Sequence, residues 1–244
     1  MGGPSGTARW ERALERGVHV GGMSERIRGV IFDVDGTLVN SNDAHARAWV
    51  QALDEAGVRV TFAEVRPLIG MGGDKLLPKL AGVDEESELG QRASRRRAEI
   101  FAHEYLPELR AFPQTRALLL RLRDTGRKLG VASSAKQEEL QALLELAQVS
   151  DLIESATSST DAARSKPDPD IVRAALDRLE LAPERAVMIG DTPYDIEAAS
   201  RLGLRTLAFR SGGRSDQDLA QAAAIYDDAA DLLARFDDSI FARA

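Results

Sequence analysis

The sequence predicts an α/β protein: a doubly wound parallel sheet with a second, all-helical domain inserted into it. Short apolar segments alternate with amphipathic helical segments from residue 115 onward, which is typical of parallel βαβ units. Another apolar segment, residues 30–34, lies well before them. Residues 42–110 show helical periodicity and no strand pattern, so we interpret them as an insertion after the first strand.

The expected elements follow this order along the chain. After the strand at residues 30–34 we expect helices at 44–56, 64–69, 75–80 and 85–106. The second half then alternates helices at 115–124, 138–147, 171–179, 196–202 and 229–236 with strands at 129–132, 152–153 (with Ala156), 186–189 and 206–209. Residues 27–40 and 112–244 would therefore form the α/β core, and residues 41–111 the helical domain.

Composition limits the possible functions. The 244 residues suffice for a core with an inserted domain, and 29% of them are charged. The net charge of −7 disfavours nonspecific binding to nucleic acid or acidic membranes, so we expect neither as a partner. The absence of cysteine excludes disulfides, thiolate catalysis and cysteine-based zinc sites. The three histidines (His19, His45 and His103) are far apart in sequence, so a serine–histidine–acid triad would need a coincidence of folding.

The N-terminal residues show no targeting signal. Residues 1–22 are rich in glycine, alanine and arginine and lack the apolar core of a secretory signal. No segment approaches the roughly 20 apolar residues that span a bilayer. We interpret residues 1–26 as a tail, either disordered or an extended translation start, with Met23 opening the folded part. The expected location is the cytoplasm.

Two aspartates at the end of the first strand are the clearest functional signal. Asp33 and Asp35 are two positions apart, so an extended chain projects both carboxylates from the same face. The carboxyl ends of strands are where open parallel sheets bind their ligands. Gly36 permits a sharp turn directly after them. Paired carboxylates without a nearby histidine indicate a hard-metal site and phosphate or ester chemistry.

Polar residues also follow two later segments of the core. Ser133 and Ser134 come between a strand and a helix, where a hydroxyl and free N–H groups bind an anion; for this pair alone, simple helix capping is the preferred interpretation. Lys166 precedes two prolines that hold the chain extended. Its ammonium would lie over a phosphate or a carboxylate cluster; the alternative is a surface lysine in a proline-rich turn.

A third strand end carries two further acids. Asp191 follows the apolar strand at 186–189 after a glycine, and Asp195 opens the next helix. The helix dipole alone explains Asp195. Asp191 is harder to explain structurally, because a charge at the end of a buried strand needs a partner or a metal.

Taken together, these motifs resemble those of the haloacid dehalogenase superfamily of phosphotransferases. Residues 33–38 match its Asp-x-Asp-Gly-Thr-Leu motif, and Ser133 its hydroxyl residue after a hydrophobic strand. Lys166-Pro167 matches the third motif, and residues 190–195 match Gly-Asp-x-x-x-Asp. The resemblance extends from about residue 27 to the C-terminus, with spacing similar to that of the phosphoglycolate phosphatase and β-phosphoglucomutase-like branch.

The resemblance implies a Rossmann-like core, a helical cap and a set of catalytic roles. Asp33 would be the nucleophile and form an aspartyl-phosphate. Asp35 would protonate the leaving alcohol and then take a proton from the attacking water. Ser133 and Lys166 would hold the phosphoryl oxygens.

The same resemblance implies a Mg²⁺ cofactor. Its ligands would be Asp33, the backbone carbonyl of Asp35 and Asp191, with water completing an octahedron. Asp195 would support this set directly or through water.

The implied activity is a phosphatase acting on a small phosphorylated metabolite. Asp35 favours phosphoryl transfer over carbon–halogen cleavage, because a departing halide needs no proton. A β-phosphoglucomutase-like mutase is the alternative, although the Gly-Asp form at residues 190–191 looks more similar to the phosphatases. A catalytically silent binding module would be expected to lack Asp33 or Lys166, and neither is missing. We expect a monomer or a homodimer.

Substrate choice is expected to depend on the cap. Lys75 follows a glycine-rich segment and would reach an anionic or hydroxyl-bearing substrate, or else be a solvated lysine in a turn. His45 and Trp49 share a helix face and would border the entrance or pack at the hinge. Ser134 completes the predicted substrate-binding residues. Asn40 departs from the family pattern, in which aspartate is common.

Overall fold

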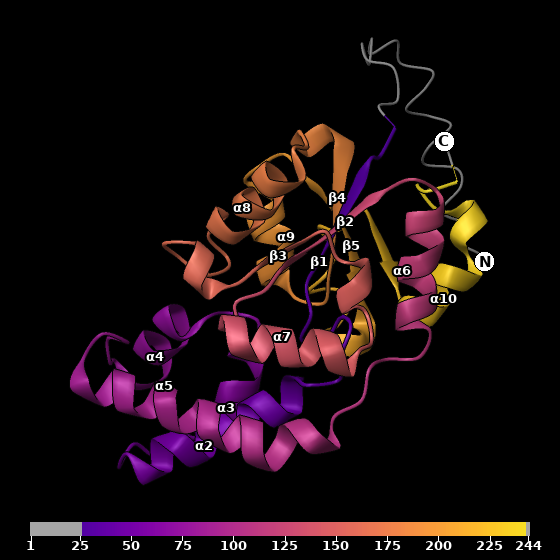
Figure 1. Ribbon diagram of the computed structural model, residues 1–244. Coiled ribbons are helices and arrows are strands. Elements are labelled where there is room, and N and C mark those ends of the chain that lie inside the picture. The colour runs from indigo at the N-terminus through magenta and orange to yellow at the C-terminus, as the bar shows by residue number, and fades with distance from the viewer. Residues whose placement is uncertain (1–25, 243–244) are drawn as a thin grey trace, which may run out of the picture.

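The computed structural model describes residues 26–242 and contains a six-stranded parallel sheet in the order β3-β2-β1-β4-β5-β6 (Figure 1). The strands are β1 (Gly29–Phe32), β2 (Lys128–Ala132), β3 (Ser155–Thr157), β4 (Ala186–Gly190), β5 (Arg205–Phe209) and β6 (Ala224–Tyr226). The strand order reverses at β1, which lies between β2 and β4. This is the predicted doubly wound topology, and ligands of such sheets bind at the carboxyl ends next to the reversal.

Helices cover both faces of the sheet. One face packs against α6 (Thr115–Asp124), α7 (Gln137–Leu146) and α10 (Ala229–Ala234), and the other against α8 (Asp170–Leu179) and α9 (Pro193–Ser200) (Figure 1). In β1, Val30 and Phe32 belong to the first apolar cluster and Ile31 to the second. Alternate residues of a strand point to opposite faces, so burial on both faces explains the uninterrupted apolar segment.

The helices of the predicted insertion lie together at one end of the sheet (Figure 1). It contains α2 (Asn42–Glu55), α3 (Phe62–Val65), α4 (Gly73–Ala81) and α5 (Glu88–Ile100). Trp49 and Leu53, one helical turn apart in α2, pack with apolar residues of α4 and α5 in a cluster separate from the sheet. The insertion therefore has an apolar core of its own.

Two edge strands differ from the sequence-based expectation. Residues 152–153 are not a strand: Ser150–Leu152 is a 3₁₀ turn, and β3 begins at Ser155 and includes Ala156. The strand β6 was not predicted. Both elements have three residues and pair on one side only, so neither shows the apolar pattern of a buried strand.

Several other boundaries were predicted too far along the chain; the helix expected at 196–202, for example, is α9, Pro193–Ser200. The first strand ends at Phe32, because residues 33–38 already form the turn at the sheet edge. The last helix ends at Ala234. The helix expected at 85–106 ends at Ile100 and continues as a π-helical turn, Phe101–Tyr105, and a 3₁₀ turn, Leu106–Glu108. The ring of Phe101 stacks there on His45.

The tail predicted at residues 1–26 lies outside the described residues except for Arg26, so the interpretation of Met23 as a start stays a prediction. Within residues 26–242, no helix has both the length and the apolar character needed to cross a membrane.

Candidate active site

The parallel register brings the predicted strand ends together at one edge of the sheet. Phe32, the last residue of β1, lies opposite Val131 of β2 and Ile189 of β4. The N–H of Asp33 donates to the Ile189 carbonyl at 2.8 Å, which places Asp33 beside the end of β4. Ser133 and Asp191 follow the two neighbouring strands directly.

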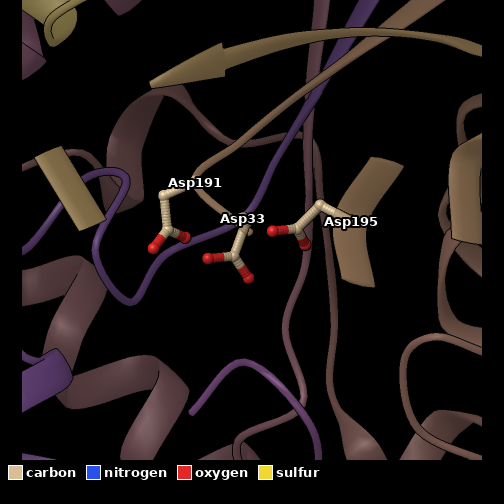
Figure 2. A group of neighbouring side chains, drawn as sticks. All are labelled: Asp33, Asp191 and Asp195. Atoms are coloured by element: carbon tan, nitrogen blue, oxygen red, sulfur yellow. The ribbon is translucent and has the colours of Figure 1, made fainter. Parts of the chain in front are cut away.

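Three carboxylates meet at this edge. Asp33, Asp191 and Asp195 each offer an oxygen atom, and these oxygens lie within 4.8 Å of one another. Figure 2 shows the Asp33 carboxylate between those of Asp191 and Asp195. All three side chains are buried. Oxygen donors so close together are suited to a hard divalent cation.

Lys166 completes the cluster. Its ammonium donates to Asp33, to Asp195 at 2.7 Å and to the Ala132 carbonyl at 3.2 Å. Only 1% of Lys166 is exposed, so the surface-lysine alternative is wrong. Asp195 also accepts from the N–H and hydroxyl of Thr192 in a capping box, which fixes it at the start of α9.

The cluster carries more negative than positive charge. Burial raises the pKa of Asp33 well above its usual value; the charges of Asp195, Asp191 and Asp35 add to the effect, and Lys166 opposes it. Burial and then the charge of Asp195 raise the pKa of Asp191 to about 7. Burial alone would lower the pKa of Lys166, but Asp195 and Asp33 outweigh it and the net shift is upward. A bound divalent cation would offset the excess negative charge.

The space around Asp191 is enclosed closely by the chain. Asn42 donates to Asp191 at 2.9 Å and Thr37 donates to it at 3.2 Å. Gly36 has a positive φ of +79°, and a Cβ there or at Gly212 would overlap the Asp191 carboxylate. Sequence reasoning did not single out Asn42, which is 149 residues away from Asp191.

Asp35 has different partners from Asp33. Its carboxylate accepts hydrogen bonds from the Ser41 hydroxyl and, at 2.7 Å, from His45 Nε2. Burial alone would raise the pKa of Asp35, but the charge and hydrogen bond of His45 and the hydrogen bond of Ser41 outweigh it, so the pKa lies below its usual value. The His45 ring is held by stacking on Phe101, with ring centroids 4.0 Å apart.

A cavity of about 50 Å³ lies between the sheet edge and the helical insertion. The sheet side contributes Asp33, Asp35, Ser134, Ala135 and Glu139; the insertion contributes His45, Trp49, Arg97 and residues 69–73. One water needs roughly 10–15 Å³ of such space, so the cavity has room for a group the size of a phosphoryl and little more.

The other predicted residues fall into two groups. Ser134 and His45 line the cavity, and Ser134 also donates to the Gly70 carbonyl at 3.3 Å. Ser133 is not among the lining residues; it is fully buried, and its hydroxyl accepts from the Ala135 N–H at 3.1 Å. Lys75 is not part of the lining, because its ammonium pairs with Asp168 at 2.8 Å.

Two charged residues of the cavity were missed by the sequence reasoning. Arg97 and Glu139 pair across the wall at 2.6 Å. Both residues belong to helices that contain several other charged residues. The sequence of each helix therefore suggests only that these charges lie on a solvent-exposed face.

Comparisons with known proteins agree with this architecture. Residues 30–209 match the model of the haloacid dehalogenase-like hydrolase family. The chain is 32% identical over 215 residues to the phosphoglycolate phosphatase of Rhodospirillum rubrum, covering 84% of this chain and 89% of that protein. A hydrolase from Pseudomonas syringae superposes with a TM-score of 0.81 at 27% identity, covering 86% of this chain and 98% of that one.

A much longer relative matches this chain over a small part of its own length. Protein SUPPRESSOR OF QUENCHING 1, chloroplastic, of Arabidopsis thaliana is 34% identical over 190 residues, which are 76% of this chain but only 18% of that protein. The family model, by contrast, covers well over half of the present chain. The chain belongs to the haloacid dehalogenase-like hydrolases.

Proposed function

We propose that this hydrolase is a Mg²⁺-dependent phosphatase that cleaves small phosphomonoesters through a phosphoryl-aspartate at Asp33. The observation that carries the proposal is the setting of the Asp33 carboxylate. It is buried at a strand end, it is held by Lys166, and it lines the cavity. The similarity to the R. rubrum phosphoglycolate phosphatase supports a phosphate ester as substrate.

The reaction would proceed in two balanced steps. A carboxylate oxygen of Asp33 attacks phosphorus, the phosphorus–oxygen bond to the alcohol breaks, and Asp35 gives the departing oxygen its proton. Asp35 then takes a proton from water, which attacks phosphorus and releases inorganic phosphate with Asp33 restored. The second step thus returns to Asp35 the proton that it gave up in the first, and His45 Nε2, 2.7 Å from the Asp35 carboxylate, would hold that group in place.

The metal would be held by Asp33, Asp191 and the backbone carbonyl of Asp35. When bound, it would neutralise charge on the phosphoryl oxygens and on the carboxylates. Asp195 would act through Lys166 or through water, because its two oxygens already accept from Lys166 and Thr192. Three buried carboxylates beside one ammonium support a divalent cation at this place.

The phosphoryl oxygens would be held from the sheet side. Lys166 supplies positive charge next to Asp33. The hydroxyl of Ser133 accepts from the Ala135 N–H, which leaves its proton free to donate to a phosphoryl oxygen. Ser134 and His45 line the cavity and would contact the substrate, whereas Lys75 is held away by Asp168.

Residues 41–111 would act as a cap over this site. Their segment 69–73 and their residues Trp49 and Arg97 close the cavity opposite the sheet. A cap in this position excludes bulk water and orders the substrate. From the similarity to the R. rubrum protein we infer only that the substrate is a phosphate ester, because the residues of the cap would determine which leaving group is accepted.

The test is hydrolysis of p-nitrophenyl phosphate by the wild type and by Asp33→Asn. We expect activity that requires Mg²⁺, is abolished by a chelator and falls at least about 10³-fold in the variant. Wild type that is inactive with every divalent metal, or a variant of equal activity, would contradict the proposal. With β-glucose 1-phosphate and a trace of the bisphosphate, glucose 6-phosphate forming faster than phosphate would identify a mutase instead.

A further inference from the structure

An ion pair lies on the cavity wall next to the site of phosphoryl transfer. Arg97 comes from α5 of the helical insertion and Glu139 from the first turn of α7 in the core, helices that lie next to each other in Figure 1. Their contact measures 2.6 Å, and the two side chains are only 11% and 12% exposed. The Arg97 guanidinium also lies 5.4 Å from the ring centroid of Trp49, which orients it.

Arg97 has hydrogen-bonding capacity left over. Of the five N–H donors of its guanidinium, one on Nη1 donates to Glu139. Its Nε is buried and has no partner among the described residues. A buried donor without an acceptor is costly, so an acceptor supplied by a ligand would stabilise this arrangement. Arg97 therefore has more hydrogen-bond donors than its contact between the insertion and the core uses, and these donors are free to bind a ligand.

The charges at this wall cancel. Arg97 is the only lysine or arginine among the residues that line the cavity, and Glu139 neutralises it. A carboxylate brought to Arg97 would lie close to the carboxylate of Glu139 and be repelled. A hydroxyl group meets no such repulsion, because it accepts from Arg97 and donates to Glu139.

A wider cleft continues from the same wall. It measures about 560 Å³, and Trp49, Arg97 and Ser134 line both it and the inner cavity. Its charged side chains are balanced, with three acids and three bases (Asp74, Glu85, Glu86, Arg95, Arg97 and Lys136). Because Arg97 is already paired with Glu139, a leaving group that extends past it enters a polar space without an excess of positive charge.

We propose that Arg97 and Glu139, beside Trp49, bind the hydroxyl groups of an uncharged, polyhydroxylated leaving group. The enzyme would then prefer phosphate esters of sugar-like polyols to phosphate esters of hydroxy acids. This inference rests on the proposed phosphatase function and adds the substrate class to it.

The test compares glycerol 3-phosphate with 3-phosphoglycerate, which differ only in a hydroxymethyl or carboxylate group at the far end. We expect wild-type kcat/KM to favour glycerol 3-phosphate by at least about 10-fold. Glu139→Gln removes the repelling charge and leaves Arg97 positive, so the ratio should shift toward 3-phosphoglycerate by at least about 10-fold. Arg97→Met should raise KM for glycerol 3-phosphate about 10-fold.

The matched control is Arg96→Met on the same helix. Arg96 is partly exposed and pairs with Glu55 and Glu99, away from the cavity, so its loss should leave the ratio unchanged. If Arg97 and Glu139 only joined the insertion to the core, Arg97→Met and Glu139→Gln would change both substrates by the same factor. That result, or a wild-type preference for 3-phosphoglycerate, would overturn the inference.

Calorimetry separates this inference from the proposed function. Both phosphate esters are titrated into the Mg²⁺-loaded wild type and the two variants under conditions without turnover, or into the same proteins carrying Asp33→Asn. Failure to hydrolyse any ester, including p-nitrophenyl phosphate, would contradict only the phosphatase function. Tighter binding of 3-phosphoglycerate than of glycerol 3-phosphate by wild type would overturn the inference whether or not hydrolysis occurs.

Discussion

Asp33 and Asp35 are the same residue type two positions apart, yet their surroundings differ. Asp33 accepts from an ammonium and has two further carboxylates within 4.8 Å, whereas Asp35 contacts a hydroxyl and an imidazole. The pKa of Asp33 is raised, chiefly by burial, and the pKa of Asp35 is lowered by His45 and Ser41 against the effect of burial. These two shifts run opposite to what a nucleophile and a proton donor need, so the roles rest on the contacts. Lys166 and a bound cation would keep Asp33 ionised, and His45 lies within hydrogen-bond distance of Asp35.

Replacing Asp35 should separate the two halves of the reaction. In Asp35→Asn, esters of alkyl alcohols should lose about 10²–10⁴-fold in kcat, because a poor leaving group needs the proton. p-Nitrophenol needs little help to depart, so p-nitrophenyl phosphate should show a rapid burst of product in stopped-flow, followed by slow hydrolysis of the phosphoryl-enzyme. Asp33→Asn, the control, should give no burst. An equal loss with both kinds of ester and no burst would contradict the role of Asp35.

Gly212 matters for the space that it leaves free. A Cβ at this position would overlap the Asp191 carboxylate. Gly212→Ala should therefore displace Asp191 and weaken Mg²⁺ binding by at least about 10-fold, measured by calorimetry, while circular dichroism stays unchanged. Ser215→Ala, an exposed position in the same loop, is the control. Unaltered metal affinity in Gly212→Ala would show that the loop adjusts.

At the scale of elements, a short seam ties the helical insertion to the core. The Pro67 carbonyl accepts from Tyr194 at 2.8 Å and from Arg214 at 2.6 Å, and Arg66 donates to the Gly212 carbonyl at 2.7 Å. Tyr194 belongs to α9, and Gly212 adjoins Asp191. Segment 66–69 is thus attached to the same loops that surround the carboxylates.

Weakening this seam should loosen the insertion over the cavity. Arg214→Ala removes the hydrogen bonds to the carbonyls of Pro67 and Ile69, so amide hydrogen exchange of residues 66–73 should accelerate. KM should rise about 3–10-fold, because closure over the substrate becomes less favourable. Arg210→Ala is the control, since Arg210 pairs with Asp216 and Asp227 of the core. Unchanged exchange in Arg214→Ala would argue against the seam.

At the scale of the whole molecule, the carboxylates that would bind the metal also lower the stability of the metal-free fold. Asp33, Asp191 and Asp195 repel one another with one ammonium between them, so the metal-free fold should be less stable than the metal-bound one. At pH 8, Asp191→Asn should raise the Tm of metal-free protein by about 2–6 °C, because it removes part of this repulsion. The same variant should lose most of the gain in Tm that Mg²⁺ gives the wild type.

Thermal unfolding with Mg²⁺ and with chelator checks this expectation. Asp54→Asn, which alters an exposed carboxylate of α2, should leave both values near those of wild type. A metal-free Asp191→Asn protein that melts below wild type would show that the hydrogen bonds from Thr37 and Asn42 outweigh the repulsion.

Predictability from sequence differed among the elements for physical reasons. The helix α6 begins and ends where expected, and β4 and β5 deviate by one residue, because a buried strand or an amphipathic helix imposes its period on neighbouring residues. The strands β3 and β6 were misplaced or missed. Short edge strands form because a neighbouring strand offers hydrogen bonds, and no local pattern records that neighbour.

The sequence by itself determined the fold class and placed acids, a lysine and a serine after strands, because these features depend on residues close together in the chain. Tertiary structure alone decided which partners each group has. Asn42 donates a hydrogen bond to Asp191, 149 positions away in the sequence, and Arg97 pairs with Glu139, 42 positions away. Such contacts depend on strand register and on the packing of the insertion against the core, and these arise only when distant segments fold together.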